Sequence, residues 1–410
     1  MATGLSSRPF GNFRQAITDL SHYFGRDELL AKVERSPAQV YILLGGRRIG
    51  KTSTLYALKE RLLQPLGSQA HVLPVLIDLR REQPASLEHL LERLLLRLQE
   101  AIVQYDLSRK PRRQKTFWGR LQRWLQALWR ALLRFFSGGK VKLGGGLVEL
   151  ELASPESSQG LSREQFEQKL SGAIAKLRQR GLEGVCFLCD SAEFIVSQDW
   201  ANDAWSYFRW LKDMNTAIAP FLGIVLSGYR DLKDYQQKVG SPLLNIAEVE
   251  WLGPLSESAT RDLLLHRSQL EQVRLSQEDV EMLLTWGGCH PYLTQQVLNA
   301  RFDWQKSAQS SSFEQVLFAS IRQCDRDFST WWDTEQRAYS FSLVEQTVYQ
   351  VLMVQRQGTA ETLAEPAQCS IGEAADALEV LAGTGVVRRR NEEDYAIGAR
   401  LFEQWVAQER

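Results

Sequence analysis

One short segment constrains this chain more than any other feature of its sequence. Residues 45–52 read GGRRIGKT, a loop with two spaced glycines that ends in Lys51 and Thr52. Glycines let the backbone wrap around an anion so that amide N–H groups face phosphate oxygens. In this pattern the lysine reaches the β- and γ-phosphates, and the threonine hydroxyl ligates magnesium. The segment therefore predicts a phosphate-binding loop (P-loop) for ATP with Mg²⁺. The expected nucleotide contacts are Gly45, Gly46, Arg47, Arg48, Ile49, Gly50, Lys51, Thr52 and Ser53.

The flanking sequence gives this loop the context that a P-loop requires. Residues 38–44 form an apolar run rich in strand formers, and leucines recur at helical spacing over 51–63. A strand before the loop and a helix after it favour a phosphate site over a glycine turn that binds nothing.

Further apolar runs predict a parallel sheet. Strands are expected at 71–79, 184–190, 220–227 and 247–252, and helices at 87–103, 163–180 and 200–214. Apolar strands that alternate with helices predict an α/β fold, a P-loop NTPase core with helices on both faces of the sheet.

The strand signals stop after Pro254. Helices are expected over 256–305 around a turn at 287–291, which predicts a helical lid. Three helices and a short strand pair near 386–397 then predict a C-terminal winged helix. The expected domains are a core at 1–253 with an insertion at about 106–160, a lid at 254–335 and a winged helix at 336–410.

Polar residues at the strand ends supply the candidate catalytic groups. Asp190 ends a strand and is expected to hold Mg²⁺ together with Thr52. The next residue is Ser191, which cannot act as a base, so Glu193 is either the water-orienting group or a structural charge. After the next strand, Ser227 is a candidate polar sensor, and Arg230 is either a phosphate contact or an exposed loop charge. We therefore expect ATP binding with slow hydrolysis or none, and the chain's status as an ATP hydrolase stays open.

Composition narrows the class of protein and its expected location. Basic and acidic residues number 49 each, so the net charge of +0 draws the chain neither to nucleic acid nor to anionic lipid. Hydrophobic content of 44% with 24% charged residues is typical of a soluble globular protein. Five cysteines without a framework spacing, among them Cys186 and Cys189 in one apolar strand, indicate buried thiols in a reducing cytoplasm. The sequence contains neither a signal-peptide pattern at residues 1–13 nor an apolar run long enough to span a membrane.

One block of sequence interrupts the predicted core. Residues 107–148 contain many basic residues and no acidic one, and aromatic and leucine side chains recur at helical spacing over 117–136. This basic amphipathic helix either packs against protein or lies at a membrane surface, where tryptophans and arginines suit the headgroup region. A small hairpin is expected over 140–152. Cytoplasmic location with peripheral contact at the inner membrane face is the corresponding expectation.

In this order and spacing, short motifs resemble the STAND class of signal-transduction ATPases, and within it the bacterial and archaeal AAA-like ATPases. The segment 23–29 (YFGRDEL) is similar to the family's FxGRxxEL box, and GGRRIGKTS is similar to its GPRRIGKTS loop. The segments 241–245, 252–255 and 288–292 (GCHPY) resemble its fifth-strand region and its lid turn. Arg8–Gly11 and Phe402–Trp405 resemble its beginning and the end of its winged helix.

The resemblance implies a regulated switch. In this class an ADP form is held closed by lid and winged helix, and exchange for ATP with a trigger permits assembly. The resemblance also implies that Gly25 and Arg26 lie near the adenine and that His290 and Pro291 contact the nucleotide from the lid. This sequence departs from the family at 190–193 (DSAE), where aspartate is usually followed directly by glutamate.

Three functions remain open at this point. The first is a switch that forms a homo-oligomer in its ATP state, with an unidentified protein trigger or effector and a role in bacterial antiviral defence by family analogy alone. The second is an origin-recognition-like DNA-binding ATPase, which is disfavoured because the expected recognition helix, 371–381, carries acidic residues and no base. The third is a nucleotide-stabilised, membrane-associated scaffold without turnover.

Overall fold

The computed structural model describes residues 15–64, 71–108, 161–239, 243–306, 313–333 and 340–409. The chain divides into two compact units. The first unit combines residues 1–83 with 173–410, and the second spans 84–172. Within the second unit, helix α4 (Leu87–Ser108) and the first part of α6 (Arg163–Gln179) are described.

A five-stranded parallel sheet forms the centre of the first unit. Its strands are β1 (Val40–Leu44), β2 (Val72–Asp78), β3 (Gly184–Asp190), β4 (Leu222–Gly228) and β5 (Glu248–Trp251). They lie in the order β2-β3-β4-β1-β5, and every neighbouring pair is parallel. All residues of β1, β3 and β4 are buried, which explains their continuous apolar sequence. The predicted α/β core is therefore confirmed.

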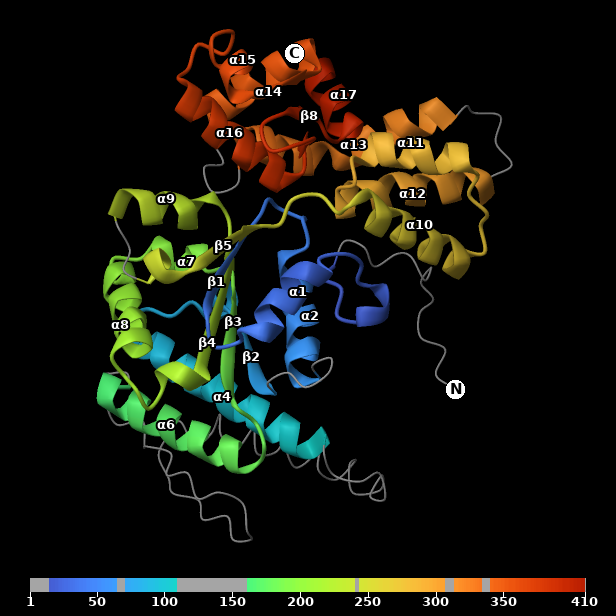
Figure 1. The fold of residues 1–410 in the computed structure, drawn as a ribbon. Helices are drawn as coiled ribbons and strands as arrows, with labels where there is room; N and C mark the ends of the chain where they lie inside the picture. Colours follow the sequence, from blue (N-terminus) through green and yellow to red (C-terminus); the bar gives the residue numbers. More distant parts are fainter. Residues whose placement is uncertain are drawn as a thin grey trace. The chain divides into compact units, whose positions relative to one another are not determined.

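Helices of the first unit lie on both faces of this sheet (Figure 1). On one face α1 (Asp27–Arg35) and α2 (Lys51–Leu63) share a buried apolar cluster with β1, β3 and β4. On the other face lies α8 (Ala201–Asp213), whose Lys212 ammonium donates to the carbonyls of Ala38, Ala219 and Leu222. Short helices α3 (Leu79–Glu82), α7 (Glu193–Val196) and α9 (Arg230–Val239) follow β2, β3 and β4.

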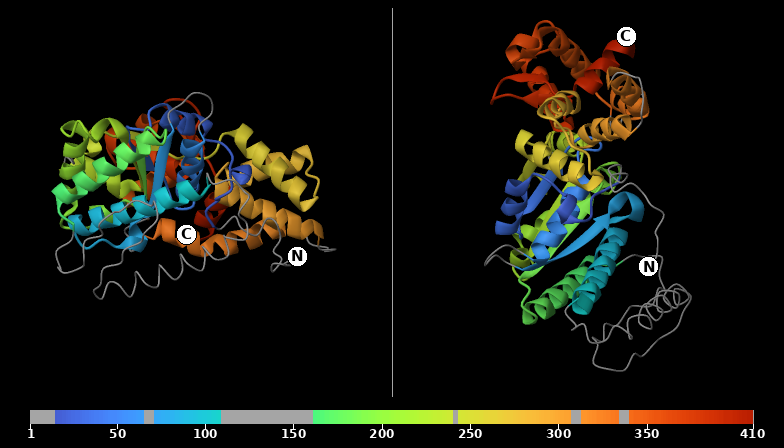
Figure 2. Two further views of the ribbon diagram at one scale, coloured as in Figure 1. Left: turned by 90° about the horizontal axis from the view of Figure 1, so that it is seen from below. Right: turned by 90° about the vertical axis from the view of Figure 1, so that its right-hand side faces the viewer.

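Within the part of the chain that the structure describes, four helices after β5 form the lid. They are α10 (Glu257–Glu271), α11 (Gln277–Gly287), α12 (Pro291–Lys306) and α13 (Phe313–Trp332). Helices α10, α11 and α12 lie side by side (Figures 1 and 2). Ser276 begins α11 with a reciprocal capping box to Asp279, which satisfies backbone N–H groups at that end.

The winged helix completes the chain. Its elements are α14 (Leu343–Gln355), β6 (Gln357–Gly358), α15 (Ala360–Ala364), α16 (Ile371–Thr384), β7 (Val387–Arg389), β8 (Tyr395–Ile397) and α17 (Arg400–Glu409). The three strands form an antiparallel sheet in the order β6-β8-β7. Aromatic rings join lid and winged helix, because Phe328 of α13 packs against Phe402 and Trp405 of α17.

Parts of the sequence-based interpretation lie outside the described residues. These are residues 8–11, the amphipathic helix at 117–136 and the hairpin at 140–152. The domain boundaries at 253 and 335 stay predictions.

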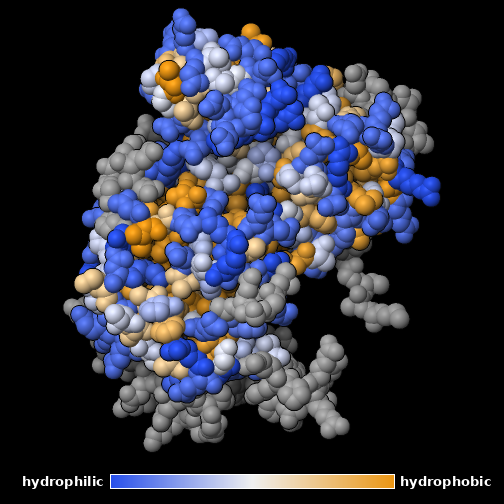
Figure 3. All heavy atoms as spheres, viewed as in Figure 1, coloured by the Kyte–Doolittle hydropathy of each residue, from blue (hydrophilic) through white to orange (hydrophobic). Residues whose placement is uncertain are grey.

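Across the described ranges, no helix combines the length and apolarity needed to cross a bilayer. Apolar and hydrophilic side chains are interspersed on the face in Figure 3. Cys186 and Cys189 are buried thiols, and burial raises the pKa of Cys186 to about 12.

Candidate functional site

The loop 45–50 connects β1 directly to the N-terminus of α2. Arg48 and Gly50 have φ angles of 64° and 102°, in the left-handed region that few side chains tolerate. The loop also folds tightly on itself, because a Cβ atom on Gly45 would lie 2.6 Å from Ile49 Cγ2. The positive end of the α2 dipole faces this turn, which makes it a favourable place for an anion.

Lys51 closes the loop with its own ammonium group. Its Nζ donates to the carbonyls of Gly45 at 2.7 Å and Gly46 at 2.9 Å. Burial lowers the pKa of Lys51, while the carboxylates of Glu193 and Asp190 oppose that shift. A cation is thus held over the loop by weak neutral acceptors, which a phosphate oxygen can replace.

Thr52 and Asp190 meet where β3 ends beside α2. The Thr52 hydroxyl donates to Asp190 Oδ2 at 2.6 Å, and the Ser227 hydroxyl donates to Asp190 Oδ1 at 2.5 Å. Ser227 is in reach because β4 lies between β1 and β3. The Ser191 N–H also donates to Asp190 Oδ1, at 3.0 Å. A hydroxyl and a carboxylate held together are hard oxygen donors, so the residues present fit Mg²⁺.

Glu193 lies on the other side of Asp190, at the start of α7. Its side chain is only 8% exposed, and Arg80 Nη2 donates to its Oε1 at 3.1 Å. The tight approach of β4 contributes, since a Cβ atom on Gly228 would lie 3.0 Å from Glu193 Oε2. Arg80 was missed by sequence reasoning. The position of Arg80 in the sequence could have identified it. Arg80 comes just after Asp78 at the end of β2, and Asp78 pairs in register with Asp190.

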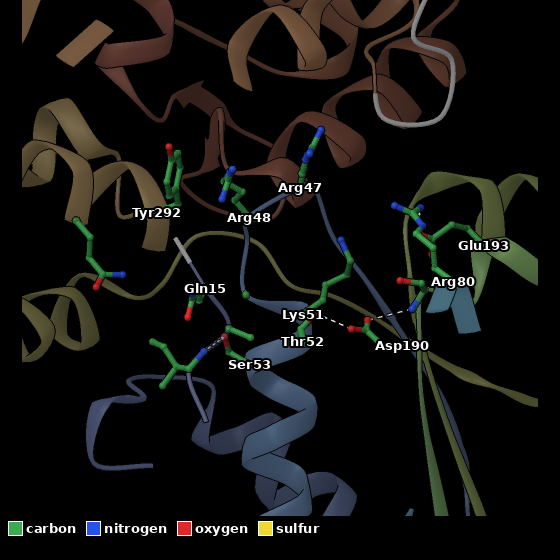
Figure 4. Close-up of a pocket in the computed structure, with 15 residues that line it drawn as sticks. Gln15, Arg47, Arg48, Lys51, Thr52, Ser53, Arg80, Asp190, Glu193 and Tyr292 are labelled. Atoms are coloured by element: carbon green, nitrogen blue, oxygen red, sulfur yellow. Dashed lines mark hydrogen bonds and ion pairs between the residues drawn. The ribbon is translucent and has the colours of Figure 1, made fainter. Parts of the chain in front are cut away.

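These residues line a cavity of about 270 Å³ (Figure 4). Its basic lining residues outnumber the acidic ones, with Arg47, Arg48, Lys51 and Arg80 against Asp190 and Glu193. The remaining lining residues are Gln15, Ala16, Ile17, Gly50, Thr52, Ser53, Ser191, Tyr292 and Gln295. An excess of positive charge around the half-buried Lys51 suits a polyphosphate chain.

The end of the cavity away from Asp190 is built by Ser53, which the sequence predicted, and by residues 15–17, Tyr292 and Gln295, which sequence reasoning missed. In Figure 4, Gln15, Ser53 and Tyr292 lie on one side of Lys51, and Arg80, Asp190 and Glu193 lie on the other. The N–H of Ile17 donates to Ser53 Oγ at 2.9 Å, which fixes the segment 15–17 beside α2. Gln295 follows Tyr292 by one helical turn of α12, so both reach the same side.

The residues implied by resemblance lie near the loop but do not line the cavity. Gly25 and Arg26 precede α1, and Arg26 Nη2 donates to the carbonyls of Gly253 at 2.6 Å and Ile49 at 3.2 Å. His290 is fully buried and precedes Pro291, the first residue of α12. Their predicted contacts with nucleotide stay predictions.

His290 serves as the N-terminal cap of α12. Its Nδ1 accepts from the N–H groups of Tyr292 at 3.2 Å and Leu293 at 3.4 Å. Accepting at Nδ1 requires the neutral ring, and burial lowers the pKa of His290 to about 3. The ring stacks on Trp331 of α13 with centroids 5.6 Å apart.

Arg230 does not line the cavity in this structure. Its Nη1 donates to both carboxylate oxygens of Glu345, at 2.7 and 2.8 Å, and its Nη2 donates to the Ser340 carbonyl at 2.9 Å. The guanidinium that the sequence offered as a phosphate contact is therefore held by the winged helix, and its role at the phosphate stays a prediction.

Comparisons with known proteins add a fold assignment. Neither a family model nor a curated protein matches this chain. The chain is similar to the solved Walker-type ATPase of Pyrococcus abyssi, with a TM-score of 0.58 and 15% identity over 96% of this chain and 98% of that chain. The chain has the P-loop ATPase fold. The Orc1 protein of Aeropyrum pernix in complex with DNA matches over 98% of each chain, with 14% identity and a TM-score of only 0.43, and adds no argument.

Proposed function

We propose that this chain is an ATP-binding switch of the STAND type. ATP with Mg²⁺ occupies the cavity at the P-loop, and exchange between ADP and ATP controls assembly into a homo-oligomer. This proposal is based mainly on the positions of Lys51, Thr52 and Asp190, whose side chains lie together at the P-loop. Lys51 lies 2.7 Å from the Gly45 carbonyl, and Thr52 lies 2.6 Å from Asp190.

Each group at the loop has a distinct task in nucleotide binding. The N–H groups of the loop and the Lys51 ammonium hold phosphate oxygens, and the excess of basic side chains offsets their charge. Thr52 and Asp190 are the residues that would hold Mg²⁺. When bound, that ion neutralises phosphate charge at the site of transfer.

Turnover depends on Glu193, and we expect it to be slow. Ser191 directly follows Asp190, so the nearest carboxylate available to orient a water is Glu193, two residues further on. Glu193 lines the cavity and is held by Arg80 through a contact of 3.1 Å. Because Glu193 does not occupy the position directly after Asp190, we expect it to orient the attacking water less well.

Contacts between the core and the winged helix support the switch. Arg230 binds Glu345 of α14, and Lys233 of α9 forms ion pairs with Asp376 and Glu379 of α16. The Gly46 N–H of the P-loop donates to the Gly383 carbonyl of α16 at 3.1 Å. A loop that binds phosphate and also contacts the winged helix offers a direct link between occupancy and docking, and we assign this arrangement to the resting form.

The same contacts weaken the DNA-binding alternative. Helix α16 directs Asp376 and Glu379 toward Lys233, and this acidic face would repel DNA phosphates. Arg389 is a basic residue of the wing that DNA phosphates could attract, but its guanidinium already donates to the Tyr395 hydroxyl at 2.7 Å.

Defence against viruses, a protein trigger and membrane contact through residues 117–136 remain parts of the proposal that rest on sequence. Loss of flotation with anionic liposomes after deletion of 107–153 would support the membrane contact.

Molar mass in solution tests the switch. The protein is measured by light scattering after gel filtration, first with ADP and Mg²⁺ and then with a non-hydrolysable ATP analogue and Mg²⁺. We expect a larger molar mass with the ATP analogue than with ADP. In Lys51→Ala we expect the same molar mass with both nucleotides. An unchanged mass in both nucleotides, at concentrations that saturate the site, contradicts the switch and favours a scaffold.

A further inference from the structure

Arg48 is the P-loop residue that contacts the lid. Its Nε donates to Asp327 Oδ1 at 3.0 Å, and its guanidinium carbon lies 4.7 Å from the centre of the Tyr292 ring. Tyr292 lies in the first turn of α12, and Asp327 lies on α13. The Tyr292 hydroxyl donates to Asp327 Oδ2 at 2.9 Å, so the three side chains form a closed network.

This network is partly shielded from water. The side chains of Arg48 and Asp327 are 28% and 13% exposed. Partial burial reduces screening, so the ion pair is stronger than one on an open surface. Arg48 also holds a φ angle of 64°, which costs a residue other than glycine on the order of 1 kcal/mol. Contacts of its side chain are a sufficient reason for an arginine at a position where glycine would be less strained.

The network borders the cavity. Arg48 and Tyr292 both line it, on the side of Lys51 opposite Asp190 (Figure 4). A phosphate chain in the cavity therefore brings negative charge to the same guanidinium that the Asp327 carboxylate holds. Two anions that share one cation repel each other, and each weakens the hold of the other.

We propose that Asp327 competes with bound phosphate for Arg48, and that Tyr292 positions Asp327 for this role. Phosphate binding loosens the contact between the P-loop and α13, and by reciprocity the contact weakens phosphate binding. Asp327 thus reports the occupancy of the P-loop to the lid. The inference rests on the proposed nucleotide site and adds residues that the site itself does not require.

The test is the affinity of Asp327→Asn for ATP and for inorganic tripolyphosphate, each with Mg²⁺, by calorimetry. Removal of the competing charge strengthens binding of both ligands about fivefold or more, the lower end of ordinary couplings between sites. The two ligands respond alike because the competition involves phosphate charge and not the base. Asp325→Asn is the matched control, since it removes the same charge from the same helix where Asp325 accepts from Trp405 Nε1, and its affinity stays at the wild-type value.

Two further variants make the outcome decisive. Tyr292→Phe keeps the ring under Arg48 and removes the donor to Asp327, so it raises the affinity less than Asp327→Asn does. This variant tests the inference even if Asp327→Asn fails to fold. In an Arg48→Ala background, Asp327→Asn gives no gain. Unchanged or weaker binding in folded Asp327→Asn, or the same gain without Arg48, overturns the inference. Wild-type protein that binds neither ligand overturns the proposed function itself.

Discussion

Thr52 and Asp190 share a hydrogen bond of 2.6 Å although 138 positions separate them in the chain. The bond joins the first turn of α2 to the end of β3, and Ser227 holds the other oxygen of the same carboxylate. Such an arrangement fixes two oxygen donors beside the Lys51 ammonium before any ligand arrives. Preorganisation of this kind reduces the free energy lost in ordering side chains on binding.

Asp190→Asn tests the assignment of Mg²⁺ to this pair. The amide keeps the size of the side chain and removes its charge, so the gain in ATP affinity that Mg²⁺ provides falls on the order of tenfold, or about 1.4 kcal/mol. Affinity in the presence of EDTA does not fall. Titration with a fluorescent ATP analogue, with and without Mg²⁺, measures both. Asp199→Asn, at an exposed position beyond α7, is the control, and an undiminished Mg²⁺ effect in Asp190→Asn would remove this residue from the metal site.

Glu193→Gln tests the candidate base. The amide cannot accept a proton, so phosphate release falls about 100-fold or to background, while ATP binds at least as tightly. Arg80→Ala removes the side chain that holds Glu193, together with one of the basic groups that line the cavity, and gives a smaller loss of turnover. Glu183→Gln, exposed just before the opposite end of β3, leaves turnover unchanged. Equal turnover in Glu193→Gln and wild type would make Glu193 a structural charge.

Glu345→Gln tests the docked winged helix. Glutamine keeps the capping box with Ser342 at the start of α14 but leaves the Arg230 guanidinium without its counter-charge. Removal of one partner from a buried ion pair costs about 3 kcal/mol, so we expect a lower melting temperature. Oligomers also form at lower ATP concentration, since the resting form is weakened. Glu257→Gln, which removes a partner from an exposed pair with Arg261, changes neither quantity. A wild-type melting temperature and an unchanged ATP requirement in Glu345→Gln would argue against the docked form as the resting state.

His290→Asn tests the buried cap of α12. The folded protein keeps His290 neutral down to about pH 3, whereas the unfolded chain takes up its proton below its ordinary pKa of 6.5. Stability from this group is therefore complete above pH 6.5 and falls by about 1.4 kcal/mol per pH unit as the pH drops toward 3. Asparagine still caps the helix but does not titrate. Denaturation by urea at several pH values should show a shallower loss for His290→Asn, and parallel curves would refute the assignment.

Local pattern predicted the elements that carry the site well. The helix expected at 51–63 is α2 with the same bounds, because a glycine before it and leucines at helical spacing define both its start and its buried face. The strand expected at 184–190 is β3, which ends at Asp190 as predicted. In both elements most of the buried residues are the apolar ones that the local pattern marks.

Convergence of distant side chains could not be predicted in this way. Arg80, Gln15 and Asp327 approach the P-loop from the end of β2, from the N-terminal segment and from α13, and no local pattern marks them. Resemblance drew attention to Arg26 and His290, which support the loop and the lid from behind the cavity. Short motifs thus identified the neighbourhood of the site, while the lining depends on how helices pack.

Calorimetric titration of the purified protein with ATP in the presence of Mg²⁺ shows whether the P-loop binds this nucleotide. We expect saturable binding of one ATP per chain, weakened at least 100-fold (about 2.7 kcal/mol) in Lys51→Ala, because the ammonium that closes the loop is lost. Absence of any binding of ATP or ADP to folded wild-type protein would contradict it.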